Sequence, residues 1–556
     1  MAGRLAARIR RSHARCRLED GGRRKSRDGA APFTMKPSAN ALMRCAIGVC
    51  LVYAASLPAV IYSVDGNSMV AVAESLVTGH SFTVSTRLLG TPGRYGSYYS
   101  MWYPLLSILA SPTVAIGVYI SHRLGLPQHY VAAMFALILS PIITAGTAPM
   151  VALLGRRLGA TTRGAMLAAL GFAFGTIALV YSRRFFADPL LALLTISGIY
   201  FAVGGNWRWT SVAAMLAVLA KPTGIVLGPC LGAYLWRKRR LAGQYIAPAV
   251  ATAAGLGIYF VYNWARFGNP LTFGEPAHFL LSVTPVALVG LLACPGTGLV
   301  WYCPAVVAAA AAPRAIFKRW EGALILAVAS AYLAEHALWI SWDEPWSWGP
   351  RLLLPAVPGL MALTALLERR RRLLLAALTA TGFAVSAPTL ISFYERYYQE
   401  AQAAHISDAQ RTWDFRYAPM TRVWGAAWRE SADAWRNADQ ARAFVHQAGS
   451  APLATSVESS RALKIVNLWW WMLPALGIPR AAGAAVSAAL VACGLWLIAG
   501  ALARAPDDDQ LAPPAPASGA TCLPLAFLER FLRGRRRSWR ARRLLDHDLG
   551  SRGHHR

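Results

Sequence analysis

The sequence predicts an all-α, polytopic transmembrane bundle of about twelve spans, with interfacial helices on its outer face. Two observations support this prediction. Hydrophobic residues make up 56% of the 556 positions and charged residues only 15%, whereas about a quarter of the residues in a soluble protein are charged. Apolar windows of about 20 residues, long enough to cross about 30 Å of hydrocarbon, also recur along the chain.

The net charge of +30 comes from basic residues whose positions are explained by membrane topology. They form short clusters between the apolar windows and at both ends of the chain, as cytoplasmic loops do under the positive-inside rule. We therefore expect both termini inside and no nucleic-acid partner. Cys294 and Cys303 flank a predicted outer loop; they could pair in an oxidising compartment or remain unpaired as small apolar residues.

The spans are predicted from apolar length and from breaks in it. Residues 208–236 are too long for one span and contain Lys221-Pro222; because proline stops or kinks a helix, two short spans are expected. Residues 104–121 either cross the membrane or lie at the outer interface, and the interfacial alternative keeps the basic cluster at 156–163 inside. A second interfacial helix is expected at 281–294. The predicted spans are 42–64, 130–153, 164–182, 188–204, two within 208–236, 244–264, 298–312, 321–341, 351–367, 373–392 and 480–503.

Composition divides the chain into five parts. Met35 precedes a basic-then-apolar stretch and is an alternative start of translation to Met1. The parts are a basic cytoplasmic arm (1–41), a transmembrane catalytic core (42–392), a polar, Trp- and Tyr-rich periplasmic segment (393–466), an interfacial piece with the last span (467–503) and a basic cytoplasmic tail (504–556).

Chemistry is expected in the first outer loop. Asp65 follows the first span and could act as a general base that takes a proton from an acceptor hydroxyl; a turn aspartate is the structural alternative. Glu74 could be a second base or a metal ligand, or a solvated residue of an interfacial helix. Arg94 and two tyrosines of the YYSMWYP stretch, Tyr99 and Tyr103, are candidates for binding substrate.

The later outer loops add further candidates. Asp188 opens a span, where the helix dipole favours a carboxylate, and Arg184 lies close to it in sequence. Lys221 and Arg351 could hold a leaving phosphate, which needs positive charge where its negative charge develops; snorkelling to the interface is the alternative. Trp348 belongs to a tryptophan run that could stack on sugars or anchor the chain in the membrane. No spacing predicts a metal centre, although a divalent metal ion stays possible.

Together these motifs resemble those of the GT-C membrane glycosyltransferases. The likeness covers residues 42–392. It rests on the acidic residue after the first span, the long outer loop with YYSMWYP, the aspartate after the third span, the KPTG break and the WSWGPR motif. It is strongest to the bacterial branch related to protein O-mannosyltransferases (glycosyltransferase family 39) and to aminoarabinose transferases that act on lipid A.

The resemblance implies a catalytic base in the first outer loop, at Asp65. Members of the family often carry a pair of acidic residues there. In this chain Asp65 is followed by Gly66, so a second carboxylate would come from Glu74 or Asp188.

The resemblance also implies a polyprenyl-phosphate-linked sugar donor, bound from the outer leaflet. The family's lysine of the first loop, in a Lys-Pro-Pro context, is replaced by Tyr103-Pro104. Phosphate binding would therefore fall to Arg94, Lys221 or Arg351.

We accordingly expect a glycosyltransferase of the bacterial inner membrane with a periplasmic active site. Its partners would be the lipid-linked donor, membrane lipids and an envelope glycan, lipid or protein acceptor, and no cofactor is predicted with certainty. One alternative is a transporter or flippase of a lipid-linked substrate, which would place ionisable residues near mid-membrane. Another is a non-catalytic assembly subunit with a GT-C-like fold.

Overall fold

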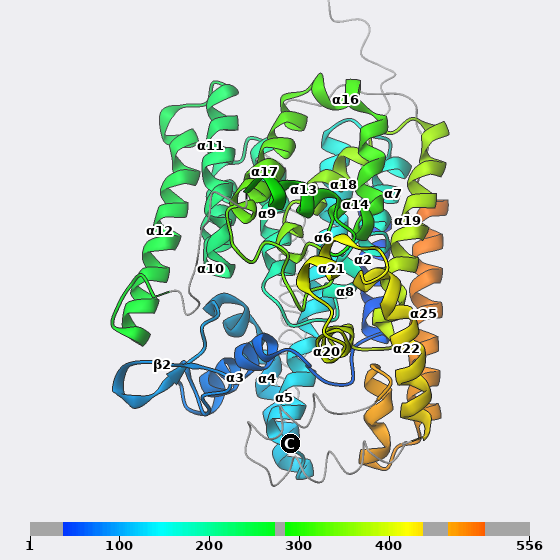
Figure 1. Ribbon diagram of the computed structural model, residues 1–556. Helices are drawn as coiled ribbons and strands as arrows, with labels where there is room; N and C mark the ends of the chain where they lie inside the picture. The colour runs from blue at the N-terminus through cyan, green and yellow to red at the C-terminus, as the bar shows by residue number, and fades with distance from the viewer. Residues whose placement is uncertain (1–36, 273–283, 437–464, 506–556) are drawn as a thin grey trace, which may run out of the picture.

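The computed structural model describes residues 37–272, 284–436 and 465–505 and is built almost entirely of helices (Figure 1). The all-α, multi-pass architecture is confirmed. The predicted arm up to residue 36 and the tail from residue 506 lie outside the described residues. Within the described ranges, five helical stretches are long and apolar enough to cross a membrane: α4 (Pro104–Leu124), α5–α6 (Gln128–Leu137 and Leu139–Arg157), α12 (Ala242–Phe267), the stretch Arg369–Leu390 with α19 (Arg372–Ser386), and α25 (Arg480–Ala503).

Each predicted span coincides, at least in part, with a helix or with adjoining helices. The break predicted at Lys221-Pro222 and the helix predicted at 281–294 are both present. The remaining elements of the bundle are α2 (Pro37–Ala55), α7 (Thr162–Phe174), α8 (Ala178–Tyr181), α9 (Asp188–Val203), α10 (Trp207–Ala220), η2 (Pro222–Val226), α11 (Leu227–Arg237), α13 (Thr284–Ala293), α14 (Leu299–Tyr302), α15 (Pro304–Val307), η4 (Ala308–Ala311), α16 (Pro313–Phe317), α17 (Trp320–Ala337), η5 (Arg351–Leu353), α18 (Val357–Thr364), η6 (Arg369–Arg371) and η7 (Ala387–Leu390).

The predicted end of the first span is wrong. The helix α2 ends at Ala55, and a non-helical linker of residues 56–63 follows. The linker contains Pro58, which disfavours helical backbone at the residue before it. Asp65 therefore belongs to the first turn of a new helix rather than to the end of the first span.

The first loop folds into the helix α3 (Val64–Thr78) and a three-stranded antiparallel sheet with strand order β1-β3-β2. In Figure 1, α3 and β2 lie below α10, α11 and α12, whereas α16 and the α11–α12 connection lie at the upper end. The strands and the turn between them are β1 (Thr83–Val84), β2 (Thr91–Pro92), η1 (Arg94–Gly96) and β3 (Tyr98–Tyr99).

The helix α4 packs beside this loop. It buries Leu106, Ala110 and Val114 in one cluster with residues of α3 and α5. Its length and composition also suit a membrane span. An interfacial position for residues 104–121 therefore stays a prediction.

Part of the segment 393–466 forms three helices, and residues 437–464 lie outside the described ranges. The aromatic piece predicted before the last span is a 3-10 helix. These elements are α20 (Glu395–Ala403), α21 (Asp408–Trp413), α22 (Pro419–Arg436) and η8 (Trp469–Leu476).

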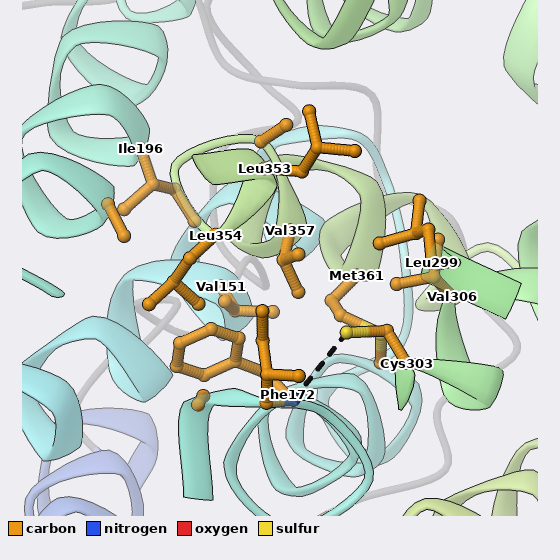
Figure 2. Packing of buried hydrophobic residues seen from close by; sticks show 14 of the residues in the cluster. Val151, Phe172, Ile196, Leu299, Cys303, Val306, Leu353, Leu354, Val357 and Met361 are labelled. Atoms are coloured by element: carbon orange, nitrogen blue, oxygen red, sulfur yellow. Dashed lines mark hydrogen bonds between the residues drawn. The ribbon is translucent and has the colours of Figure 1, made fainter. Parts of the chain in front are cut away.

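The main core lies where α6, α7, α9 and α18 meet the short helices α14 and α15 (Figure 2). Phe172 and Met361 lie at its centre, and both are almost fully buried. The Cys303 thiol accepts a hydrogen bond from the backbone N–H of Ile177 at 3.5 Å. Cys294 and Cys303 are both free, so the possible disulfide between them does not form.

The first and last helices of the described residues, α2 and α25, pack closely through a pair of glycines. A Cβ atom on Gly48 would lie 2.6 Å from the Gly494 carbonyl oxygen, and one on Gly494 would lie 2.7 Å from that of Gly48. Small residues let helix backbones approach in this way within membranes. The last described helix is therefore packed against the first described helix.

Candidate functional site

Four predicted residues from distant parts of the sequence converge at one place. Asp65 lies in the first turn of α3, and Asp188 is the first residue of α9. Lys221 ends α10, and Arg351 opens η5. The structure thus brings together the two carboxylates and the two cations that the sequence pattern places on the same side of the membrane.

Arg351 lies between three carboxylates. Its Nη1 atom is 3.6 Å from Oδ2 of Asp65, and its Nε atom is 3.8 Å from Oδ2 of Asp188 and 3.4 Å from Oε1 of Glu344. The centre of its guanidinium lies 4.6 Å from the ring centre of Phe186. These N–O separations exceed the usual hydrogen-bond length of about 2.9 Å. The contact with Glu344 is a long hydrogen bond from Nε, and charge attraction is the main effect that positions the guanidinium.

Lys221 reaches Asp188 because the helix breaks at this lysine. Its backbone is extended, with φ −162° and ψ 131°, and Pro222 follows. Its Nζ atom donates to Oδ1 of Asp188 at 2.7 Å, and both side chains are largely buried. Pro189, near the start of α9, suits a helix N-terminus, and the helix dipole there favours the Asp188 carboxylate.

Glu344 is the fifth member of the cluster and was not among the predicted site residues. It lies in a loop in which Glu344, Trp346 and Gly349 all have positive φ, at 43°, 74° and 63°. Its Oε2 atom accepts a hydrogen bond from the backbone N–H of Leu352 at 3.1 Å, so this carboxylate supports the turn that presents Arg351. Burial raises the pKa of Glu344 to about 7, against the attraction of Arg351, which lowers it.

Asp65 is the most accessible carboxylate of the cluster. Its side chain is 28% exposed, against 4% for Asp188 and 3% for Glu344. Burial raises the pKa of Asp65 above its usual range, although Arg351 lowers it. A raised pKa makes the ionised carboxylate a stronger base, and its exposure lets a substrate reach it.

A buried arginine fixes the linker that leads to Asp65. Arg183 is 2% exposed and donates to backbone carbonyls of three segments. It donates to Ser56 of the linker, to Thr389 and Leu390 of η7 at 2.7 and 3.0 Å, and to Asn467 at 2.7 Å. Arg183 therefore has a structural role that no local sequence pattern could have revealed.

Two predicted substrate-binding residues are instead committed to packing. Arg184 forms a two-pronged ion pair with Glu395, at 2.8 and 3.0 Å, and both side chains are buried. The Trp348 ring is fully buried and packs edge-on against Tyr302 at 5.3 Å. Neither side chain is exposed at a surface that a substrate could reach in this structure.

Glu74 lies away from the cluster, nine residues further along α3, or roughly 13 Å at 1.5 Å per residue. Its carboxylate contacts His129 and accepts from Nε2 of Gln128 at 3.2 Å. Among the residues that the structure describes, no group of three or more His, Cys, Asp or Glu side chains is arranged to hold a metal ion.

The predicted first-loop contacts form a second group at the end of α12. The guanidinium of Arg94 lies 4.9 Å from the Trp264 ring centre. The Tyr99 and Phe267 rings are 6.0 Å apart, and the Tyr103 and Tyr259 rings are 5.7 Å apart. The structure thus places these three residues against α12 rather than around Arg351.

Comparison with known proteins finds similar chain folds but no sequence relative. No protein-family model and no curated protein matches the sequence. ArnT from Cupriavidus metallidurans matches in its apo state with a TM-score of 0.44 and 14% identity, over 82% of this chain and 75% of that one.

Two further structures match in the same way. ArnT bound to undecaprenyl phosphate gives a TM-score of 0.43 and 15% identity, over 81% of this chain and 76% of that one. The apo oligosaccharyltransferase of Archaeoglobus fulgidus gives 0.37 and 11%, over 88% of this chain and 62% of that one.

Proposed function

We propose that this protein is a membrane glycosyltransferase that moves a sugar from a polyprenyl-phosphate donor to an acceptor of the cell envelope. The convergence of Asp65, Asp188, Lys221 and Arg351 on one site is the observation that supports it most directly. A base and a pair of cations side by side suit a displacement at a sugar carbon with a phosphate leaving group. The sequence motifs resemble glycosyltransferases of this kind.

The reaction proceeds as a single displacement. Asp65 takes the proton of an acceptor hydroxyl as that oxygen attacks the anomeric carbon. The bond from this carbon to the phosphate oxygen breaks, and its electron pair leaves with the polyprenyl phosphate, which gains a second negative charge. Arg351 and Lys221 neutralise that charge as it develops. Asp188 holds Lys221 in place, and the configuration at the anomeric carbon inverts.

We infer that this site faces the periplasm from the bacterial inner membrane. The α11–α12 connection, with its WRKRR cluster, and α16 lie at the end of the bundle opposite α3 (Figure 1). Basic clusters mark the cytoplasmic side. The donor would therefore approach from the outer leaflet, and the acceptor, an envelope glycan, lipid or protein, from the periplasm.

The test is the substitution Asp65→Asn in a strain that lacks the chromosomal copy. Mass spectrometry of envelope lipids, glycans and proteins identifies the modification that disappears on deletion. Wild type should restore it, and so should the control Asp414→Asn, whose side chain only caps a turn. Asp65→Asn should fail to restore it while reaching the membrane in normal amount. Full restoration by Asp65→Asn would refute the role as base.

A further inference from the structure

A second polar network joins α3 to α5 at some distance from the Arg351 cluster. It consists of Glu74, His129 and Asn67. Glu74 and Asn67 are buried, and only 14% of the His129 side chain is exposed. Through Asn67 the network reaches the last residues of the linker, which lie close in sequence to Asp65.

Asn67 fixes the direction of its own hydrogen bonds. Its Nδ2 atom donates to the carbonyl oxygens of Ile61 at 2.8 Å and Ser63 at 2.9 Å. Because the amide group has its donors on one atom, its Oδ1 atom must be the acceptor. The Nε2 atom of His129 lies 3.0 Å from that oxygen, so the ring carries a proton on Nε2 and donates it.

The other ring nitrogen faces a carboxylate. Nδ1 of His129 makes a short contact with Oε2 of Glu74, while Oε1 of Glu74 accepts from Gln128. Two acceptors cannot face each other at this separation, so one proton lies between Nδ1 and Oε2. Hydrogen bonds at both ring nitrogens of His129 therefore connect the Glu74 carboxylate to the Asn67 amide.

We propose that the hydrogen-bonded chain of Glu74, His129 and Asn67, here called the relay, holds the first turn of α3 in place and thereby orients Asp65. Asn67 holds the carbonyls of residues 61 and 63, and Ser63 caps the helix by accepting from the Gly66 N–H at 3.2 Å. Asp65 lies between these anchored residues. The relay fixes Asn67 from the far end of α3 and from α5, so its removal frees the segment that carries the base. None of its three members touches the substrate.

The experiment uses the full-length protein in lipid nanodiscs with His129→Gln and, as a second variant, Glu74→Gln, which keeps the side-chain size. His80→Asn is the matched control: His80 is exposed, and its positive φ of 51° suits asparagine. Hydrogen exchange followed by mass spectrometry reports on residues 57–68. Turnover and donor KM are measured with the modification identified above.

Both variants should exchange several-fold faster in residues 57–68 than wild type, and the control should not. The kcat should fall about tenfold with the KM of the donor within about twofold, because the base is misplaced while the cations that hold the phosphate stay in position. A merely structural contact would lower the melting temperature without this split between kcat and KM.

Unchanged exchange in both variants overturns the relay, and so does faster exchange with an unchanged kcat. The proposal that Asp65 is aimed for catalysis rests on the proposed function, but the exchange measurement does not. If Asp65→Asn retains full activity, the role of Asp65 as the base fails, whereas faster exchange in His129→Gln still supports the relay as the network that holds the start of α3.

Discussion

Glu344 should make the affinity for an anionic donor depend on pH. Below its pKa of about 7 the carboxyl is protonated and neutral. Above it, a negative charge lies 3.4 Å from Nε of Arg351 and competes with the donor phosphate for that cation. A sugar-phosphate diester carries one negative charge throughout this range, so a change in KM reports on the protein. KM for the donor should rise as the pH rises through about 7.

The size of the effect follows from Coulomb's law. A phosphate bound to Arg351 would lie roughly 7 Å from the Glu344 carboxylate. With an effective dielectric constant of about 20 to 40, one charge is worth roughly 1–2 kcal/mol at that distance. Full ionisation of Glu344 should therefore raise the donor KM about 5- to 30-fold, of which about 3- to 8-fold is reached between about pH 6 and pH 8.

Glu344→Gln should abolish this rise and keep KM near its low-pH value. The substitution keeps an oxygen that can accept from the Leu352 N–H. Glu430→Gln is the matched control, because burial also raises the pKa of Glu430 to about 7, yet this side chain pairs with Arg396. Initial rates over a range of donor concentrations at each pH give KM. If Glu344→Gln shows the same rise as wild type, Glu344 does not set the charge of the site.

Two further substitutions test the ion pairs. Lys221→Met should destabilise the protein by about 3 kcal/mol, because it leaves the buried Asp188 with only the longer contact to Arg351. Thermal unfolding should show that adding Asp188→Asn recovers part of this loss of stability. Arg184→Met should lower the free energy of unfolding by about 3–5 kcal/mol, since Glu395 is left buried without its partner. The donor KM of the protein that remains folded should not change. A higher KM in Arg184→Met with unchanged stability would restore this residue as a substrate contact.

The helical bundle could be predicted because apolar length is a strong local signal. The break at Lys221 was also predictable from a local signal, because Pro222 cannot continue a regular helix. The end of α2 was missed, although Pro58 was a visible signal, because the apolar run continues beyond it.

The meeting of Asp65, Asp188, Lys221 and Arg351 was predictable from topology, since all four were placed at the same membrane surface. What each charge pairs with was not. Arg184 finds Glu395 across 211 positions of sequence, and no pattern in its neighbourhood indicates that partner.

Glu344 was not singled out from the other polar residues of the outer loops because its role depends on a loop with left-handed backbone positions. The sequence WDEPWSWG contains Pro345 and Gly349, which mark a turn, but a turn does not reveal which carboxyl faces inward. The burial of the Trp348 ring was hidden for a related reason: a tryptophan-rich loop looks the same in sequence whether its rings face lipid, sugar or the core.

The linker before Asp65 is held by residues that are synthesised late, long after the linker itself. The Ala59 N–H donates to Oδ1 of Asn467 at 3.3 Å, and the Trp469 N–H donates to the Leu57 carbonyl at 2.9 Å. At about 5–20 residues per second, some 400 positions of synthesis separate the two sides, a delay of roughly 20–80 seconds. The nascent chain therefore inserts most of its helices before Asp65, the base of the proposed reaction, can adopt its final position. A product truncated ahead of Asn467 should be inserted yet lack the proposed activity.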